Sequence, residues 1–79
     1  MANVIVYSKA NCGYCDAAKA LLTKKGIEFE EKRVDLNPEF FAEMQAVTDN
    51  ARTMPQIIID GKPIGGFQEL YQLEQKGEL

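Results

Sequence analysis

Cys12 and Cys15 are the only cysteines in this 79-residue chain, and just two residues separate them. A thiolate is the nucleophile in disulfide exchange, and an ordinary free cysteine has a pKa of about 8.5. With two intervening residues at the start of a helix, the two sulfurs can meet, and they can form and reopen an internal disulfide. A predicted strand precedes the pair and a predicted helix follows it, which is typical of redox-active cysteine pairs. The sequence therefore predicts thiol–disulfide exchange at Cys12 and Cys15.

The two cysteines are expected to have different roles because they stand at different places relative to the helix predicted over residues 13–25. Cys12 lies just before this helix, where unpaired N–H groups and the positive end of the helix dipole stabilise an anion. Half ionisation at pH 7 needs about 2 kcal/mol of preference for the thiolate, and Lys9 on the same loop can add to the dipole. Cys15 lies one turn inside and is more shielded. We therefore expect Cys12 to attack and Cys15 to resolve.

Other cysteine chemistries find little support in the composition. The chain has no histidine, so a cysteine protease would lack its usual base and a closed zinc site would lack two of its four ligands. A small secreted domain held together by disulfides would carry more cysteines. The remaining alternative is a pair of buried core thiols, which would make the chain a redox-silent small domain.

The length and charge indicate one domain over residues 1–79. The formal net charge is −3, whereas a nucleic-acid binder would usually carry a basic surplus. No apolar run exceeds four residues, which is too short to span a membrane, and the first residues lack the pattern of a signal peptide. We therefore expect a cytoplasmic protein without nucleic-acid or membrane partners.

The first half of the chain contains the elements that position the cysteine pair. Residues 4–7 are β-branched or aromatic and predict a buried strand. The helix over residues 13–25 has an apolar face of alanine and leucine, and Gly26 can provide its left-handed cap. The alternation of apolar and polar side chains over residues 27–30 predicts a half-buried second strand, with extended chain continuing to residue 36.

The second half predicts a helix, a hairpin and a final helix. Asn37 and Pro38 are typical of a helix start, and Asp60-Gly61 predicts a hairpin turn between strands at residues 56–59 and 62–64. Gly65-Gly66 precedes a last helix, and the expected packing face consists of Phe67, Leu70, Tyr71 and Leu73. The order β-α-β-α-β-β-α predicts an α/β, thioredoxin-like fold: the first two strands are parallel with a right-handed crossover, and the last two are antiparallel.

Two further motifs have the properties of a ligand site. Pro55 follows Thr53 and Met54, and a cis bond before it would turn the Met54 N–H and C=O toward an extended peptide. Gly65-Gly66 leaves N–H groups free at a helix start, where a carboxylate can bind. A trans proline at a strand start and a plain strand-to-helix turn are the structural alternatives.

Over essentially its full length the sequence resembles the glutaredoxin family. The matching stretches are residues 4–9, 12–15, 19–22, 53–61 and 64–66. The resemblance implies a four-stranded mixed sheet flanked by three helices, and a cis bond before Pro55. It also implies that glutathione is the co-substrate.

The resemblance further implies which residues hold glutathione. The γ-glutamyl carboxylate is expected at Gly66, Phe67 and Gln68. The cysteine backbone is expected to pair with Met54, and the glycine carboxylate to meet Lys9. The full set of expected contacts is Lys9, Tyr14, Arg52, Thr53, Met54, Pro55, Gly66, Phe67 and Gln68.

The mechanism that the resemblance implies has two steps. The Cys12 thiolate attacks the glutathionyl sulfur of a mixed disulfide, and a second glutathione then frees Cys12. For protein disulfides, Cys15 closes the Cys12–Cys15 bond and two glutathiones reopen it, with electrons from NADPH through a separate glutathione reductase. The expected partners are therefore glutathione and glutathionylated or disulfide-containing proteins, and the chain is expected to be a monomer.

Some positions depart from the family pattern and leave alternatives open. Gly13 replaces the usual proline, while Phe67 and Gln68 replace a small residue and an aspartate. Gly13 keeps open a dimer around a [2Fe–2S] cluster, ligated by Cys12 of each chain and two glutathiones; no other metal site is expected. The other alternative is a thioredoxin-reductase-dependent electron donor to ribonucleotide reductase, for which glutathione would be irrelevant.

Overall fold

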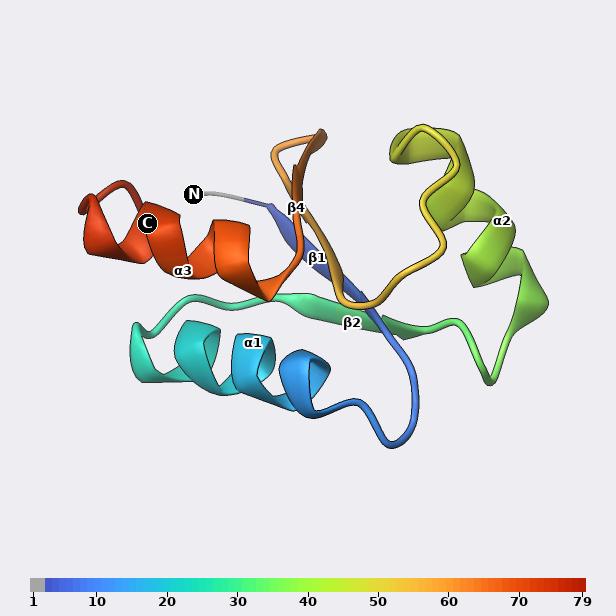
Figure 1. Ribbon diagram of the computed structural model, residues 1–79, viewed down its shortest axis with the longest axis horizontal. Helices are drawn as coiled ribbons and strands as arrows, with labels where there is room; N and C mark the ends of the chain where they lie inside the picture. Colours follow the sequence, from blue (N-terminus) through green and yellow to red (C-terminus); the bar gives the residue numbers. More distant parts are fainter. Residues whose placement is uncertain (1–2) are drawn as a thin grey trace.

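The computed structural model describes residues 3–79, and its elements follow the predicted order (Figure 1). The boundaries agree with the sequence to within a residue or two, except at the second strand. None of the helices in the described range is long and apolar enough to cross a membrane. The elements are β1 (Val4–Ser8), α1 (Gly13–Lys24), β2 (Glu30–Arg33), α2 (Pro38–Val47), β3 (Gln56–Ile59), β4 (Lys62–Gly65) and α3 (Phe67–Gln75).

The four strands form one mixed sheet in the order β2-β1-β3-β4. β1 and β2 are parallel, whereas β1–β3 and β3–β4 are antiparallel, as predicted. Asp60 and Gly61 both have positive φ, as the favoured two-residue hairpin turn requires. Pro63 lies on the edge strand β4, where its missing N–H interrupts no inner ladder. The α/β, thioredoxin-like architecture expected from the sequence is confirmed.

The sheet separates two hydrophobic clusters because successive strand residues face opposite sides. Val4 and Val6 of β1 pack with Leu22 of α1 and Leu70 of α3. Tyr7, from the other face of β1, belongs to a cluster with residues of α2 and β3. Helices α1 and α3 therefore cover one face, and α2 covers the other, apart from them in Figure 1.

The prediction of a strand over residues 27–30 is wrong, since β2 begins at Glu30. Gly26 has a φ of +71° and the Ile27 N–H donates to Leu22 O, so residues 26 and 27 still belong to the C-terminal cap of α1. Ile27 and Phe29 pack against the α1–α3 cluster without forming strand ladder pairs. The alternation of apolar and polar side chains here therefore reflects the burial of Ile27 and Phe29 and not strand pairing.

The expected packing face of α3 is only partly confirmed. Leu70 is fully buried and Phe67 is half-buried against the core. Tyr71, by contrast, exposes 47% of its surface, so its assignment to the core is wrong. Val47 of α2 is also exposed.

A polar network connects α1, which begins directly after Cys12 and contains Cys15, to strands β1 and β2. The buried Ser8 hydroxyl donates to Glu31 at 2.6 Å, and Lys19 pairs with the same carboxylate at 2.8 Å. The hydrogen bond from Lys19, followed by that from Ser8, lowers the pKa of the Glu31 carboxyl below its ordinary value. The ionised form of Glu31 therefore stabilises the fold.

Replacing Glu31 with glutamine is expected to lower the free energy of unfolding at pH 7 by about 1 kcal/mol, since a part-buried charged pair is lost. Because the folded-state pKa is depressed, this stabilisation is present above the ordinary glutamate pKa and is lost as pH falls through the lowered value. Urea unfolding of wild type and variant should therefore differ at pH 7 and converge as the pH falls through the lowered pKa of Glu31. Glu30→Gln, which removes an equal charge from an exposed neighbour on β2, is the matched control; an equal effect there would contradict the assignment.

Candidate active site

The structure joins Cys12 and Cys15 as a disulfide, with Cα atoms 5.2 Å apart, and so describes the oxidised form. Cys12 precedes α1 as its N-cap residue and is partly exposed, whereas Cys15 lies inside the first turn and is fully buried. The expected difference in shielding between the two sulfurs is thus present. Of the two cysteines, only Cys12 is partly accessible to an incoming substrate, which is the geometry on which the predicted roles depend.

The start of α1 provides electrostatic stabilisation for Cys12. The Cys15 N–H donates to Cys12 Sγ at 3.1 Å, so the side chain of Cys12 caps its own helix. In the reduced protein this N–H, together with the helix dipole, favours the thiolate over the thiol. Asp16 in the same turn opposes that effect, but Lys19 approaches its carboxylate to 3.6 Å. Lys9 is exposed on the loop before the helix.

A second loop faces the disulfide. The Met54–Pro55 peptide bond is cis, as expected, and the Met54 carbonyl oxygen lies 3.8 Å from Cys12 Sγ. The amide of Gln56 braces this loop by donating to the Thr53 carbonyl at 2.9 Å and to its hydroxyl at 3.2 Å. Sequence reasoning missed the role of Gln56, because a polar residue at the first position of a strand gives no signal of its own.

The start of α3 forms the third part of the site. Gly66 is the N-cap residue, and its N–H donates to the Glu69 carboxylate at 2.7 Å. The N–H groups of Phe67 and Gln68, as first-turn residues, have no acceptor within the helix. Glu69 was not predicted as part of the site, although an acidic residue three positions after an N-cap is a known capping signal.

These three segments line an open pocket of about 290 Å³. Neither cysteine lines it, but Met54, which does, has its carbonyl oxygen 3.8 Å from Cys12 Sγ. Seven of the nine residues expected to hold glutathione line it, and Lys9 and Arg52 do not. Both of these cations are exposed. The lining residues are Tyr14, Thr53, Met54, Pro55, Gln56, Gly65, Gly66, Phe67, Gln68 and Glu69.

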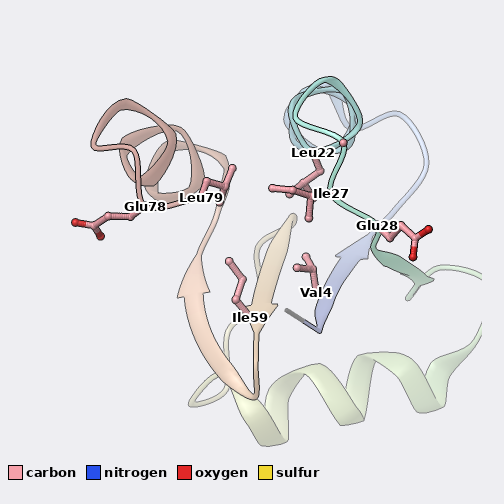
Figure 2. Close-up of a pocket in the computed structure, with 8 residues that line it drawn as sticks. Val4, Leu22, Ile27, Glu28, Ile59, Glu78 and Leu79 are labelled. Atoms are coloured by element: carbon pink, nitrogen blue, oxygen red, sulfur yellow. The ribbon is translucent and has the colours of Figure 1, made fainter. Parts of the chain in front are cut away.

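A larger cavity of about 470 Å³ lies elsewhere, next to Val4 at the start of β1, whereas Cys12 follows the end of that strand (Figure 2). Its walls are mostly aliphatic, and Figure 2 shows the carboxylates of Glu28 and Glu78 pointing away from its centre. Among residues 3–79, no thiol, hydroxyl or cationic side chain lines this cavity. We therefore place the chemistry at the smaller pocket.

Residues 3–79 contain no group of three or more histidine, cysteine, aspartate or glutamate side chains that could hold a metal ion. An iron–sulfur cluster at Cys12 would therefore require ligands from outside this chain. It would also require reduction of the disulfide, because Cys12 Sγ is bonded to Cys15 here.

The strand–cysteine–helix unit, the cis-proline loop and the mixed sheet together are those of a thiol–disulfide oxidoreductase with a thioredoxin-like fold. The glutaredoxin family model matches residues 4–64. Glutaredoxin 3 of Escherichia coli (strain K12) is 46% identical over 79 residues, covering 100% of this chain and 94% of that protein. A glutaredoxin of Neisseria meningitidis serogroup A is 45% identical over 80 residues, covering 100% of this chain and 93% of the relative.

A solved structure extends the similarity to the fold. The crystal structure of a buckwheat glutaredoxin–glutathione complex superposes with a TM-score of 0.86 at 30% sequence identity, covering 99% of this chain and 73% of that one. The chain belongs to the glutaredoxin family. Its cysteine pair is accordingly a redox-active dithiol.

Proposed function

We propose that this protein reduces glutathionyl mixed disulfides and protein disulfides with glutathione as its co-substrate. The observation that carries the proposal is the 290 Å³ pocket, which connects Tyr14 between the cysteines, Met54 beside Cys12 Sγ, and the start of α3. The similar buckwheat protein was solved as a glutathione complex. A tripeptide with a carboxylate at each end suits a pocket with an extended loop on one side and a helix N-terminus on another.

The first step is an attack by the Cys12 thiolate on the glutathionyl sulfur of a mixed disulfide. The Cys12–glutathione bond forms as the substrate disulfide breaks, and the substrate leaves as a thiolate that takes a proton from water. A second glutathione thiolate then attacks the bound glutathionyl sulfur and restores reduced Cys12, releasing glutathione disulfide. NADPH reduces this product through a separate glutathione reductase.

Protein disulfides require the second cysteine. Cys12 attacks one substrate sulfur, and the Cys15 thiolate then attacks Cys12 Sγ, which releases the reduced substrate and closes the internal disulfide. Two glutathiones reopen that bond in two further exchanges. The 5.2 Å separation of the Cα atoms and the helix N-cap geometry are compatible with this closure.

Each part of glutathione has a proposed position. The γ-glutamyl carboxylate accepts hydrogen bonds from the Phe67 and Gln68 N–H groups, because the Gly66 N–H already donates to Glu69. The cysteine backbone pairs with Met54 on the cis-proline loop. Lys9 and Arg52 lie outside the pocket lining, so we propose that they act through charge on the glycine carboxylate and not through close packing.

Lys9→Glu is expected to raise KM for a glutathionyl mixed disulfide by about tenfold, because it places a like charge near the glycine carboxylate. It should also lower kcat, because the positive charge of Lys9 adds to the helix dipole that favours the Cys12 thiolate. The assay follows NADPH consumption with glutathione, glutathione reductase and the mixed disulfide of glutathione with 2-mercaptoethanol. Lys24→Glu changes the charge equally at the far end of α1 and is the matched control.

Two outcomes would count against this proposal. An equal rise in KM in Lys9→Glu and Lys24→Glu would remove Lys9 from the site. A wild type that is inactive with glutathione but reduced by thioredoxin reductase would favour the ribonucleotide reductase donor instead. No feature of the described residues specifically favours that donor or the cluster carrier, and the monomeric state and cytoplasmic location stay predictions.

A further inference from the structure

Three aromatic side chains form a row that runs from the active site along α3. The rings of Tyr14 and Phe67 stack with centroids 6.0 Å apart, and the rings of Phe67 and Tyr71 lie at the same separation. Phe67 and Tyr71 are four residues apart on α3, which places them on one face of the helix. We call Tyr14, Phe67 and Tyr71 the aromatic row.

The two ends of the aromatic row are exposed, whereas Phe67 between them is half-buried against the core. Tyr14 and Tyr71 expose 63% and 47% of their surfaces, while Leu70 supplies the buried contact of α3. Large apolar side chains left in contact with each other at the surface mark interaction sites more often than scattered ones do. Tyrosine suits such sites because it offers a large, rigid contact at low entropy cost.

The row is continuous with the place where a substrate must bind. Tyr14 and Phe67 line the 290 Å³ pocket, and Tyr71 does not. Cys12 is partly exposed whereas Cys15 is buried, so a substrate disulfide has to reach Cys12, two residues before Tyr14. A small thiol leaving group would end near Tyr14, whereas a peptide chain would continue past Phe67 toward Tyr71.

We propose that the aromatic row binds an extended segment of the protein substrate that carries apolar or aromatic side chains two and four residues from its disulfide cysteine. An extended chain rises about 3.3 Å per residue, so each 6.0 Å ring step matches about two residues. Side chains at alternate positions of such a segment face the same side. The inference rests on the proposed function and adds the class of protein substrate.

The test compares glutathionylated peptides that differ only at those two positions. One set carries phenylalanine two and four residues from the cysteine, on its N-terminal or its C-terminal side, and the other carries serine. In one chain direction, wild type is expected to turn over the phenylalanine peptide with a kcat/KM about fivefold higher than the serine peptide. Tyr71→Ala should remove about half or more of this preference, and Tyr71→Phe should keep it.

Controls separate this inference from the proposed function. Gln72→Ala alters an exposed neighbour on α3 and should leave the preference intact. The small glutathionyl substrate should react equally with wild type and Tyr71→Ala, because it does not reach Tyr71. Inactivity of wild type on that substrate would overturn the proposed function. Activity without any preference between the peptides would overturn only the proposed role of the aromatic row in binding protein substrates.

A binding measurement tests the surface independently of turnover. The phenylalanine peptide with serine in place of its cysteine is added to the oxidised protein, and the NMR chemical shifts of the aromatic row are followed. Shifts confined to Tyr14, Phe67 and Tyr71 that are lost with the serine-for-phenylalanine peptide are the expected result. Shifts elsewhere, or none at millimolar peptide, would contradict the proposal.

Discussion

Cys12→Ser is expected to reduce turnover of the glutathione–mercaptoethanol mixed disulfide by about a thousandfold or more, whereas Cys15→Ser should stay within about threefold of wild type. A serine hydroxyl at position 12 cannot form the intermediate disulfide, however well the pocket binds glutathione. Cys15 is fully buried and takes no part in the two exchanges with a glutathionyl substrate. The assay is the coupled consumption of NADPH.

The expected activity of Cys15→Ser depends on the substrate. With a protein disulfide, the mixed disulfide at Cys12 needs an internal thiolate to release it quickly, so Cys15→Ser should lose most of that activity. Retention of the small-substrate activity together with loss of the protein-disulfide activity would support both role assignments. Equal loss of both activities in Cys15→Ser would contradict them.

Stability measurements on the same variants test whether a loss of activity is caused by unfolding. Reduced wild type, Cys12→Ser and Cys15→Ser all lack the disulfide, so their urea midpoints are comparable. Serine at position 12 keeps an N-cap acceptor for the Cys15 N–H, and it should cost little stability. Serine at position 15 buries a hydroxyl in an apolar site and should cost more, so its activity must be measured well below its unfolding midpoint.

Much of this fold follows from signals that lie within a few residues of each other. Residues 4–7 predicted β1, and the Asn37-Pro38 start of α2 is confirmed by a hydrogen bond from the Glu39 N–H to the Asn37 side chain. The hairpin at Asp60-Gly61 is confirmed by the positive φ of both residues. The prediction of Cys12 at the start of α1 also rests on local signals, because a helix start needs no distant partner.

The mistakes arise where the decisive contact is distant in sequence. Ile27 and Phe29 alternate like strand residues, but pairing of β2 with β1 starts only at Glu30 opposite Ile5. Tyr71 has the spacing of a core residue, yet Leu70 fills the space beneath α3 and Tyr71 joins the exposed row. The sequence pattern within either segment does not indicate where another helix or strand will pack.

The candidate site also contains residues that the sequence predicted and residues that it did not. The cysteine pair and the cis-proline loop stand out because their residue types are uncommon and specific. Gln56 and Glu69 were missed although each acts on backbone groups only three residues away. Glu69 carries a capping signal that the sequence analysis did not use, whereas Gln56 carries no such signal. The resemblance placed Lys9 and Arg52 among the glutathione contacts, and the structure leaves them outside the pocket lining.

Gly65→Ala is expected to lower the free energy of unfolding by about 2–4 kcal/mol, which is a large effect on stability for a single substitution. Gly65 has a φ of +112°, a conformation that costs an alanine about 1–3 kcal/mol. A Cβ atom there would lie 2.6 Å from Glu69 Oε1, so the carboxylate must move. Its hydrogen bond to the Gly66 N–H, which caps α3, would then be lost at a further cost of about 1 kcal/mol.

Gly61→Ala separates the two causes. Gly61 also has a positive φ, of +80°, but an added Cβ would meet none of the described residues within 4 Å. Gly61→Ala should therefore be destabilised only by the strained turn conformation. Comparing Glu69→Ala with Gly65→Ala/Glu69→Ala removes the contact with Glu69 while keeping the strained φ. If Gly65→Ala costs no more than Gly61→Ala in urea unfolding, the contact with Glu69 does not constrain this position.

The same substitution should also impair the site, because Gly65 lines the pocket proposed to bind glutathione and directly precedes the α3 cap. Displacing Glu69 frees the Gly66 N–H but disturbs the first turn, where the Phe67 and Gln68 N–H groups are proposed to hold a carboxylate. We therefore expect KM for the glutathionyl substrate to rise about tenfold under conditions where Gly65→Ala remains folded, while Gly61→Ala leaves KM unchanged. Since Cys12 lies on another element, kcat should change much less than KM, and a fall confined to kcat would contradict the link between this helix start and substrate binding.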